Sequence, residues 1–92
     1  MNRPYELGTA PPARRALADL LPPEVAVSAA ECITGPLLEN PRKIGKPLRD
    51  ALAGIRSARL DREWRILYEI DDAKHLVIVL EIRHRSNAYR TR

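Results

Sequence analysis

A chain of 92 residues has room for one domain with one modest hydrophobic core. We therefore take residues 1–92 as a single domain and exclude a two-domain organisation. Its 45% apolar and 30% charged residues, with a net charge of +4, indicate a folded globular protein rather than a disordered one. The longest apolar run, residues 76–80, is far too short to cross a bilayer and no signal peptide is apparent, so we expect a soluble cytoplasmic protein.

The N-terminal part of the chain predicts a strand followed by a helix. Residues 5–10 have strand character. Pro11 and Pro12 then stop the strand and suit the first turn of a helix, where a missing N–H costs little. Apolar side chains recur at helical spacing over residues 13–21, which predicts an amphipathic helix.

A second helix is predicted to begin at Glu24, after Pro22 and Pro23 break the first. Gly35 and Pro36 end or kink it. One stripe of this helix is apolar and consists of Val25, Ala29, Cys32 and Ile33. The two segments therefore predict an antiparallel helical hairpin with a tight, proline-rich turn.

The C-terminal half predicts an antiparallel meander. Residues 40–50 are rich in Pro, Gly and basic side chains, and they predict a loop. Strand character follows over residues 55–59, 63–70 and 76–83, the last two separated by the polar turn 71–74. The expected fold class is α+β: an N-terminal strand, a two-helix antiparallel hairpin and a meander sheet packed on the helices.

Alternation along the last two predicted strands assigns their side chains to two faces. One set in each strand is wholly apolar and is expected to meet the helices: Trp64, Ile66, Tyr68 and Ile70, and Leu76, Ile78, Leu80 and Ile82. Arg65 and Arg83 belong to the opposite sets, so we expect them to project together from the uncovered face. For residues 55–59 the alternation leaves open whether Arg56 or Arg59 faces that side.

Two segments concentrate the positive charge. Residues 42–65 carry a net charge of +5 and residues 83–92 a net charge of +4, whereas the rest of the chain is net negative. Such clustering is what a polyanion-binding surface requires, although merely solvated faces also show it. The lone Cys32 excludes an internal disulfide and has no His or Cys at zinc-ligand spacing, so we expect no metal and no cofactor.

Four stretches of the chain together carry the signature of a known family. They read GPLLENP (35–41), GKPLR (45–49), WRILYEIDD (64–72) and IRHRSNAYR (82–90). In combination they resemble the RelE branch of the RelE/ParE toxin superfamily. The most specific feature is an aromatic-Arg-apolar-apolar-Tyr strand combined with a terminal Arg-x-Arg-Ser-x-x-Tyr.

The resemblance implies a RelE-like fold of the microbial ribonuclease type over nearly the whole chain. It also implies a type II toxin: a ribosome-dependent mRNA endonuclease that enters the ribosomal A site and cleaves the codon there. The implied reaction needs no metal and leaves a 2′,3′-cyclic phosphate. The implied partners are the ribosome, mRNA and a cognate RelB-like antitoxin in a heteromeric complex, with no membrane.

Matching positions carry the family's functional residues onto this chain. Arg65 matches the arginine that holds the scissile phosphate, Arg83 the proposed general acid, and Tyr89 the tyrosine that stacks on or activates the nucleotide. The family's first-strand lysines are replaced here by Arg56 or Arg59. The expected substrate-binding residues are, in all, Arg56, Arg59, Arg85, Lys43, Lys46 and Arg49.

The implied chemistry leaves the general base open. RNA supplies its own 2′-hydroxyl nucleophile, so the protein must clamp the phosphate, stabilise the charge of the phosphorane and exchange protons. Arginine stays protonated in proteins and is a poor base. Tyr89 and His84 are the candidates for the general base. The third possibility is that no side chain acts as the base and that catalysis depends on electrostatics and on ribosomal RNA. We favour this third possibility, with Tyr89 assisting.

Two other functions fit parts of the sequence. A ParE-like inhibitor of DNA gyrase would share the fold but would not need Arg65, Arg83 and Tyr89 as a set. A non-catalytic RNA-binding module would need only the basic charge.

Overall fold

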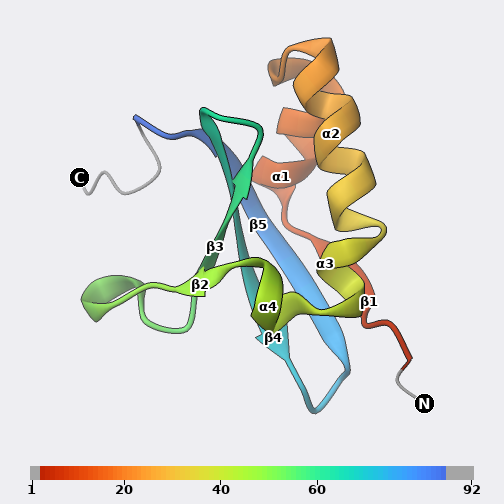
Figure 1. Ribbon diagram of the computed structural model, residues 1–92, viewed down its shortest axis with the longest axis vertical. Helices are drawn as coiled ribbons and strands as arrows, with labels where there is room; N and C mark the ends of the chain where they lie inside the picture. The colour runs from red at the N-terminus through yellow and green to blue at the C-terminus, as the bar shows by residue number, and fades with distance from the viewer. Residues whose placement is uncertain (1–2, 87–92) are drawn as a thin grey trace.

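The computed structural model describes residues 3–86 as a mixed five-stranded sheet with helices packed on one face (Figure 1). The strand order is β1-β5-β4-β3-β2. The strands are β1 (Glu6–Thr9), β2 (Lys46–Pro47), β3 (Arg56–Leu60), β4 (Trp64–Asp71) and β5 (Leu76–His84). β1 pairs with β5 in parallel and the other pairs are antiparallel. The predicted N-terminal strand and C-terminal meander are confirmed.

The predicted helical hairpin is also confirmed. Its first arm is α1 (Pro11–Arg15), which runs into a π-helical turn, η1 (Ala16–Leu20), and its second arm is α2 (Pro23–Ile33). A short helix, α3 (Pro36–Glu39), follows the kink at Gly35. On α2 the buried side chains are Val25, Ala29 and Ile33, and Cys32 packs beside them half-buried, as the apolar stripe predicts. None of the helices within residues 3–86 is long and apolar enough to cross a membrane.

The prediction of a plain loop over residues 40–50 is wrong. This segment contains a one-turn helix, α4 (Pro41–Ile44), and the edge strand β2, and η2 (Asp50–Leu52) is a 3-10 turn just beyond. Such short elements show no periodicity, because tertiary hydrogen bonds rather than an apolar face hold them. The hydroxyl of Tyr68 donates to the Pro41 carbonyl at 2.5 Å, and Arg56 Nη2 donates to the carbonyls of Arg42 at 2.8 Å and Gly45 at 2.9 Å.

Gly45 lets this segment approach the sheet closely. A Cβ at this position would lie 2.6 Å from the hydroxyl of Tyr68 and 2.8 Å from the carbonyl oxygen of Ser57. Both contacts are far inside van der Waals distance, and the second is with backbone that cannot swing away. A side chain at position 45 would therefore push β2 off β3.

A β-bulge in β5 overturns part of the predicted face assignment. Leu67 pairs with Glu81 but its neighbour Tyr68 pairs with Val79, so Leu80 is an extra residue without a partner in β4. The alternation therefore reverses within β5, as it does at bulges generally. Val77 and Val79 are fully buried against the helices in place of the expected Leu76, Ile78 and Leu80, which are only partly buried. Ile82 is buried as predicted.

The end of the sheet at the β4–β5 turn is tied together by a polar network. Arg42 binds the carboxylate of Asp72 through both terminal nitrogens, at 2.5 and 3.2 Å, and the hydroxyl of Tyr5 donates to Asp72 at 2.7 Å. The adjacent guanidinium lowers the pKa of Asp72 below its usual value. The network thus links α4, the N-terminal segment and the turn, three segments whose contact no local sequence pattern predicts.

Tyr68→Phe tests the hydrogen bond that anchors α4. Tyr68 is fully buried, so the variant would remove the hydroxyl donor from a carbonyl that water cannot easily reach. We expect the free energy of unfolding, measured by urea denaturation, to fall by about 1–3 kcal/mol. Tyr5→Phe is the matched control, since it removes a hydroxyl whose hydrogen bond is solvent-exposed. Equal losses in the two variants would contradict the anchoring role.

Candidate active site

Three arginines form one cross-strand row on the sheet face opposite the helices. Arg59 on β3 pairs with Arg65 on β4, and Arg65 pairs with Arg83 on β5. Side chains in such register lie on the same face, with Cβ atoms about 4.5–5.5 Å apart in each pair. Ala58 and Leu60 are buried on the helix side, so Arg59 rather than Arg56 occupies the open face. The structure thus resolves the alternative that sequence alternation left open.

A second cross-strand row runs beside the arginines. It consists of Lys46 on β2, Ser57 on β3, Leu67 on β4 and Glu81 on β5. Leu67 is buried although it lies on the open face and outside the main hydrophobic core. It therefore provides a dry floor between Ser57 and Glu81, and a low-dielectric floor strengthens the electrostatic attraction of nearby cations for an anion.

Each arginine of the row is held differently. Arg59 is exposed, while Arg65 is half-buried and donates from Nη1 to the carbonyl of Trp64 at 3.1 Å. Arg83 is paired with Glu81, through Nε to one carboxylate oxygen and through Nη2 to the other at 3.0 Å. Two positions of the row are thus oriented by hydrogen bonds, and planar guanidinium groups so placed suit two-pronged binding of phosphate oxygens.

A pocket of about 340 Å³ adjoins the row on the side of β2. Its polar lining comes from Lys46, Ser57, Arg59 and Arg65, and its apolar lining includes Ile44 and Leu48. Figure 1 shows the chain between β2 and η2 extending from the sheet on the side away from the helices. A pocket with cations on one wall and apolar side chains on the other suits a sugar-phosphate with its attached base.

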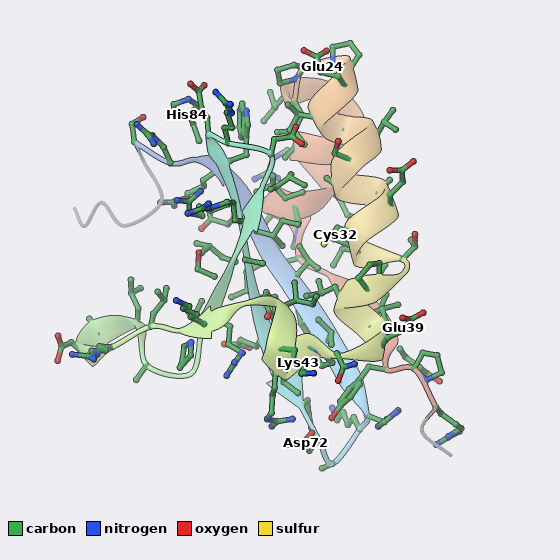
Figure 2. All side chains as sticks on the ribbon, viewed as in Figure 1. Glu24, Cys32, Glu39, Lys43, Asp72 and His84 are labelled. Atoms are coloured by element: carbon green, nitrogen blue, oxygen red, sulfur yellow. The ribbon has the colours of Figure 1, made fainter. Side chains whose placement is uncertain are left out.

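The remaining basic residues singled out from the sequence are not members of the arginine row. Arg56 lies on the face of β3 that is turned toward the helices. It donates hydrogen bonds to backbone carbonyls at the end of α4, which gives it a structural role. Lys43 is exposed on α4 (Figure 2). Arg49 and Arg85 are exposed, one just before η2 and the other just after β5. Tyr89 lies outside the described residues.

His84 sits on the opposite face of β5 from Arg83. Its Nε2 lies 3.2 Å from a carboxylate oxygen of Glu63 and its Nδ1 lies 3.0 Å from the hydroxyl of Ser86. The ring meets that of Trp64 edge-on, with centroids 5.3 Å apart. Figure 2 shows His84 at the end of the sheet remote from Asp72. Within residues 3–86 no group of three or more His, Cys, Asp or Glu side chains could hold a metal ion.

Sequence reasoning missed the neighbours of the arginines. Glu81 shares the open face with Arg83 and pairs with that arginine, which the sequence analysis does not predict. The available signal was its position two residues before Arg83, which puts both side chains on one face of the same strand. Leu67 and Ser57 carried no such signal, because their place beside the site depends on strand register.

Comparison with known proteins gives a consistent result. The family profile described as ParE toxin of type II toxin–antitoxin systems matches residues 10–89. The chain is 42% identical to toxin RelE of Mycobacterium tuberculosis, over 97% of this chain and 90% of the relative. It is 41% identical to toxin RelG of the same organism, over 95% of this chain and 98% of that toxin.

A solved structure agrees with these sequence relatives. The RelBE2 toxin–antitoxin complex from Mycobacterium tuberculosis contains a chain that matches with a TM-score of 0.82 and 41% identity, covering 90% of this chain and all of that one.

The open face should bind single-stranded RNA through its phosphates. For a short oligouridylate, we expect the logarithm of the affinity to fall with the logarithm of salt concentration, with a slope of about −0.7 per phosphate contacted. Arg65→Ala should make this slope shallower by about 0.7. Arg3→Ala, which removes the same charge from the exposed N-terminal segment, should leave it unchanged. Equal slopes for the two variants would rule out the open face as the RNA-binding surface.

Proposed function

Because this chain belongs to the ParE toxin family of type II toxin–antitoxin systems, we propose that it is a RelE-type, ribosome-dependent mRNA endonuclease. It would cut the codon in the ribosomal A site and so stop translation in the cytoplasm, where ribosomes act. The observation that carries the proposal is the row of Arg59, Arg65 and Arg83 across three strands of the open face. The identity of 42% to a RelE toxin over nearly the whole chain supports the RelE branch.

The proposed reaction uses a nucleophile that belongs to the substrate. The 2′-oxygen of the RNA attacks the adjacent phosphorus, the bond from phosphorus to the 5′-oxygen breaks, and a 2′,3′-cyclic phosphate remains. Negative charge accumulates on the non-bridging oxygens of the phosphorane. Fixed guanidinium groups on a partly dry surface stabilise that charge without a metal ion, because they need little reorganisation during the reaction.

The geometry suggests a division of labour. Arg65, oriented by its own strand, would hold the scissile phosphate, with Arg83 stabilising the phosphorane and the leaving oxygen. Arg59 and Lys46 would bind the flanking sugar-phosphate at the adjoining pocket. The exposed Lys43, Arg49 and Arg85 would contact the RNA backbone, and Tyr89 would stack on or activate the nucleotide.

The partner of the toxin would be a RelB-like antitoxin. The related mycobacterial chain was solved as a toxin–antitoxin complex, and an active nuclease of translation has to be neutralised at rest. Purification of the untagged chain from its own host should therefore yield a heteromeric complex, and isolation as a free monomer would count against this partner.

A second candidate function is inhibition of DNA gyrase, because the matched family carries the name ParE. It does not account for an arginine row on the open face. The two functions separate in one assay, because a gyrase inhibitor leaves ribosome-bound mRNA intact and induces DNA damage.

Arg83 is the residue whose loss should best separate catalysis from folding. On ribosomes programmed with a defined mRNA, the parent protein should produce 3′ ends within the A-site codon, mapped by primer extension. Arg83→Ala should lower the cleavage rate by about 10²- to 10³-fold, since one charge-stabilising donor is lost. Arg83→Lys should recover only part of the activity, because the charge remains but the planar two-pronged contact does not.

The same measurement needs a folding control and a charge control. Arg83 is a partly exposed strand residue, so we expect the free energy of unfolding of Arg83→Ala to lie within about 1 kcal/mol of that of the parent. Arg3→Ala should cleave like the parent. If Arg83→Ala still cuts A-site mRNA within a few-fold of the parent rate, the assignment of this residue is wrong.

A further inference from the structure

The arginine row has a carboxylate as its neighbour. Glu81 lies on the open face and binds Arg83 through both carboxylate oxygens. The cross-strand partner of Glu81 on β4 is Leu67. The buried side chain of Leu67 separates Glu81 from Ser57, which belongs to the same cross-strand row. Its side chain is 32% exposed, so it is partly shielded yet reachable from solvent.

Glu81 also borders space that a ribose could occupy. β1 pairs only with the first part of β5, up to Val79, so the edge of β5 beyond the bulge is not covered by a strand on that side. A pocket of about 470 Å³ lies there, between the helical hairpin and the end of β5. It is lined by Glu81 and Arg83, by Arg15 and Leu20 of the hairpin, and by Trp64, Ile82 and His84 from the helix-facing side of the sheet. Substrate bound to the arginine row could therefore place a sugar next to the carboxylate.

The proposed reaction needs a base that the arginines cannot provide. A guanidinium stays protonated at any physiological pH and cannot accept the proton of the 2′-hydroxyl. His84 projects from the other face of β5 and is engaged with Glu63 and Ser86. A carboxylate, in contrast, is ionised at neutral pH and accepts protons as a general base in many enzymes.

The geometry points to Glu81 as the general base of this site, an inference that rests on the proposed function. Glu81 takes the proton from the 2′-hydroxyl as the bond from that oxygen to phosphorus forms. The bond from phosphorus to the 5′-oxygen breaks, the departing oxygen takes a proton from water, and the carboxyl group then returns its own proton to solvent. The 2′-oxygen and the phosphorus that it attacks lie close together in space. The base that deprotonates the 2′-hydroxyl must therefore lie beside the cation that binds the phosphate.

The pairing with Arg83 is what makes this placement useful. The guanidinium fixes the orientation of the carboxylate, and both side chains come from the same face of one strand. The charged and titratable groups around Glu81 are Arg83 on its own strand, Arg65 and Glu69 on the same face of β4, and Arg15, which lines the edge pocket together with His84 from the opposite face of β5. Arg83 thus holds the carboxylate in place beside the phosphate-binding row.

Glu81→Gln tests the inference against a purely structural role. The amide can still accept a hydrogen bond from Arg83 but cannot take up a proton. On programmed ribosomes we expect cleavage to slow by about 10²- to 10⁴-fold. The pH–rate profile of the parent should have an acid limb, reporting ionisation of the base, that the variant lacks. Glu81→Asp, which keeps the proton acceptor on a shorter side chain, should restore part of the rate together with the acid limb.

Glu69→Gln is the matched control. Glu69 lies on the same face of the sheet, on β4, where it pairs with Ile78 rather than with an arginine, and this variant should cleave within a few-fold of the parent. Ribosome binding should be the same in all variants. If the parent cleaves and Glu81→Gln keeps both its rate and its acid limb, the inference is overturned and Glu81 merely orients Arg83. If the parent itself fails to cleave, the proposed function fails first.

Discussion

One extra residue in β5 determines what both faces of the sheet present. Upstream of Leu80, Val77 and Val79 face the helices, and downstream Ile82 does so. In a regular strand with the same buried valines, Ile82 would turn to the open side and Arg83 would turn into the core. The bulge reverses the alternation between these two stretches, so a continuous apolar core and a charged open face can coexist on one strand.

The like charges on the open face destabilise the fold, and the function of this face explains why they are present. Like charges opposite each other on neighbouring strands are destabilising, and Arg59, Arg65 and Arg83 form two such pairs. Glu81 offsets the charge of Arg83, and the fully buried Tyr68 and the network around Asp72 hold the surrounding elements in place. Such an arrangement is expected where a surface is kept for a polyanion rather than for stability.

Much of this architecture follows from the sequence, and the failures have identifiable causes. Helical periodicity, paired prolines and strand alternation sufficed to predict the hairpin, the meander and the shared face of Arg65 and Arg83. Alternation could not reveal the bulge, because both faces of residues 76–80 are apolar and either set could be buried. Nor could it reveal α4 and β2, whose stability comes from Tyr68 and Arg56, distant in sequence. The register between strands, which brings Arg59 and Ser57 to the site, emerges only from the paired strands.

The most direct test of this account is a structure of the protein on a ribosome whose A-site codon carries 2′-deoxy substitutions that prevent cleavage. The scissile phosphate should lie within hydrogen-bond distance of both Arg65 and Arg83, on the face of the sheet opposite the helices. A codon bound at the helical face, or at the end of the sheet near Asp72, would contradict it.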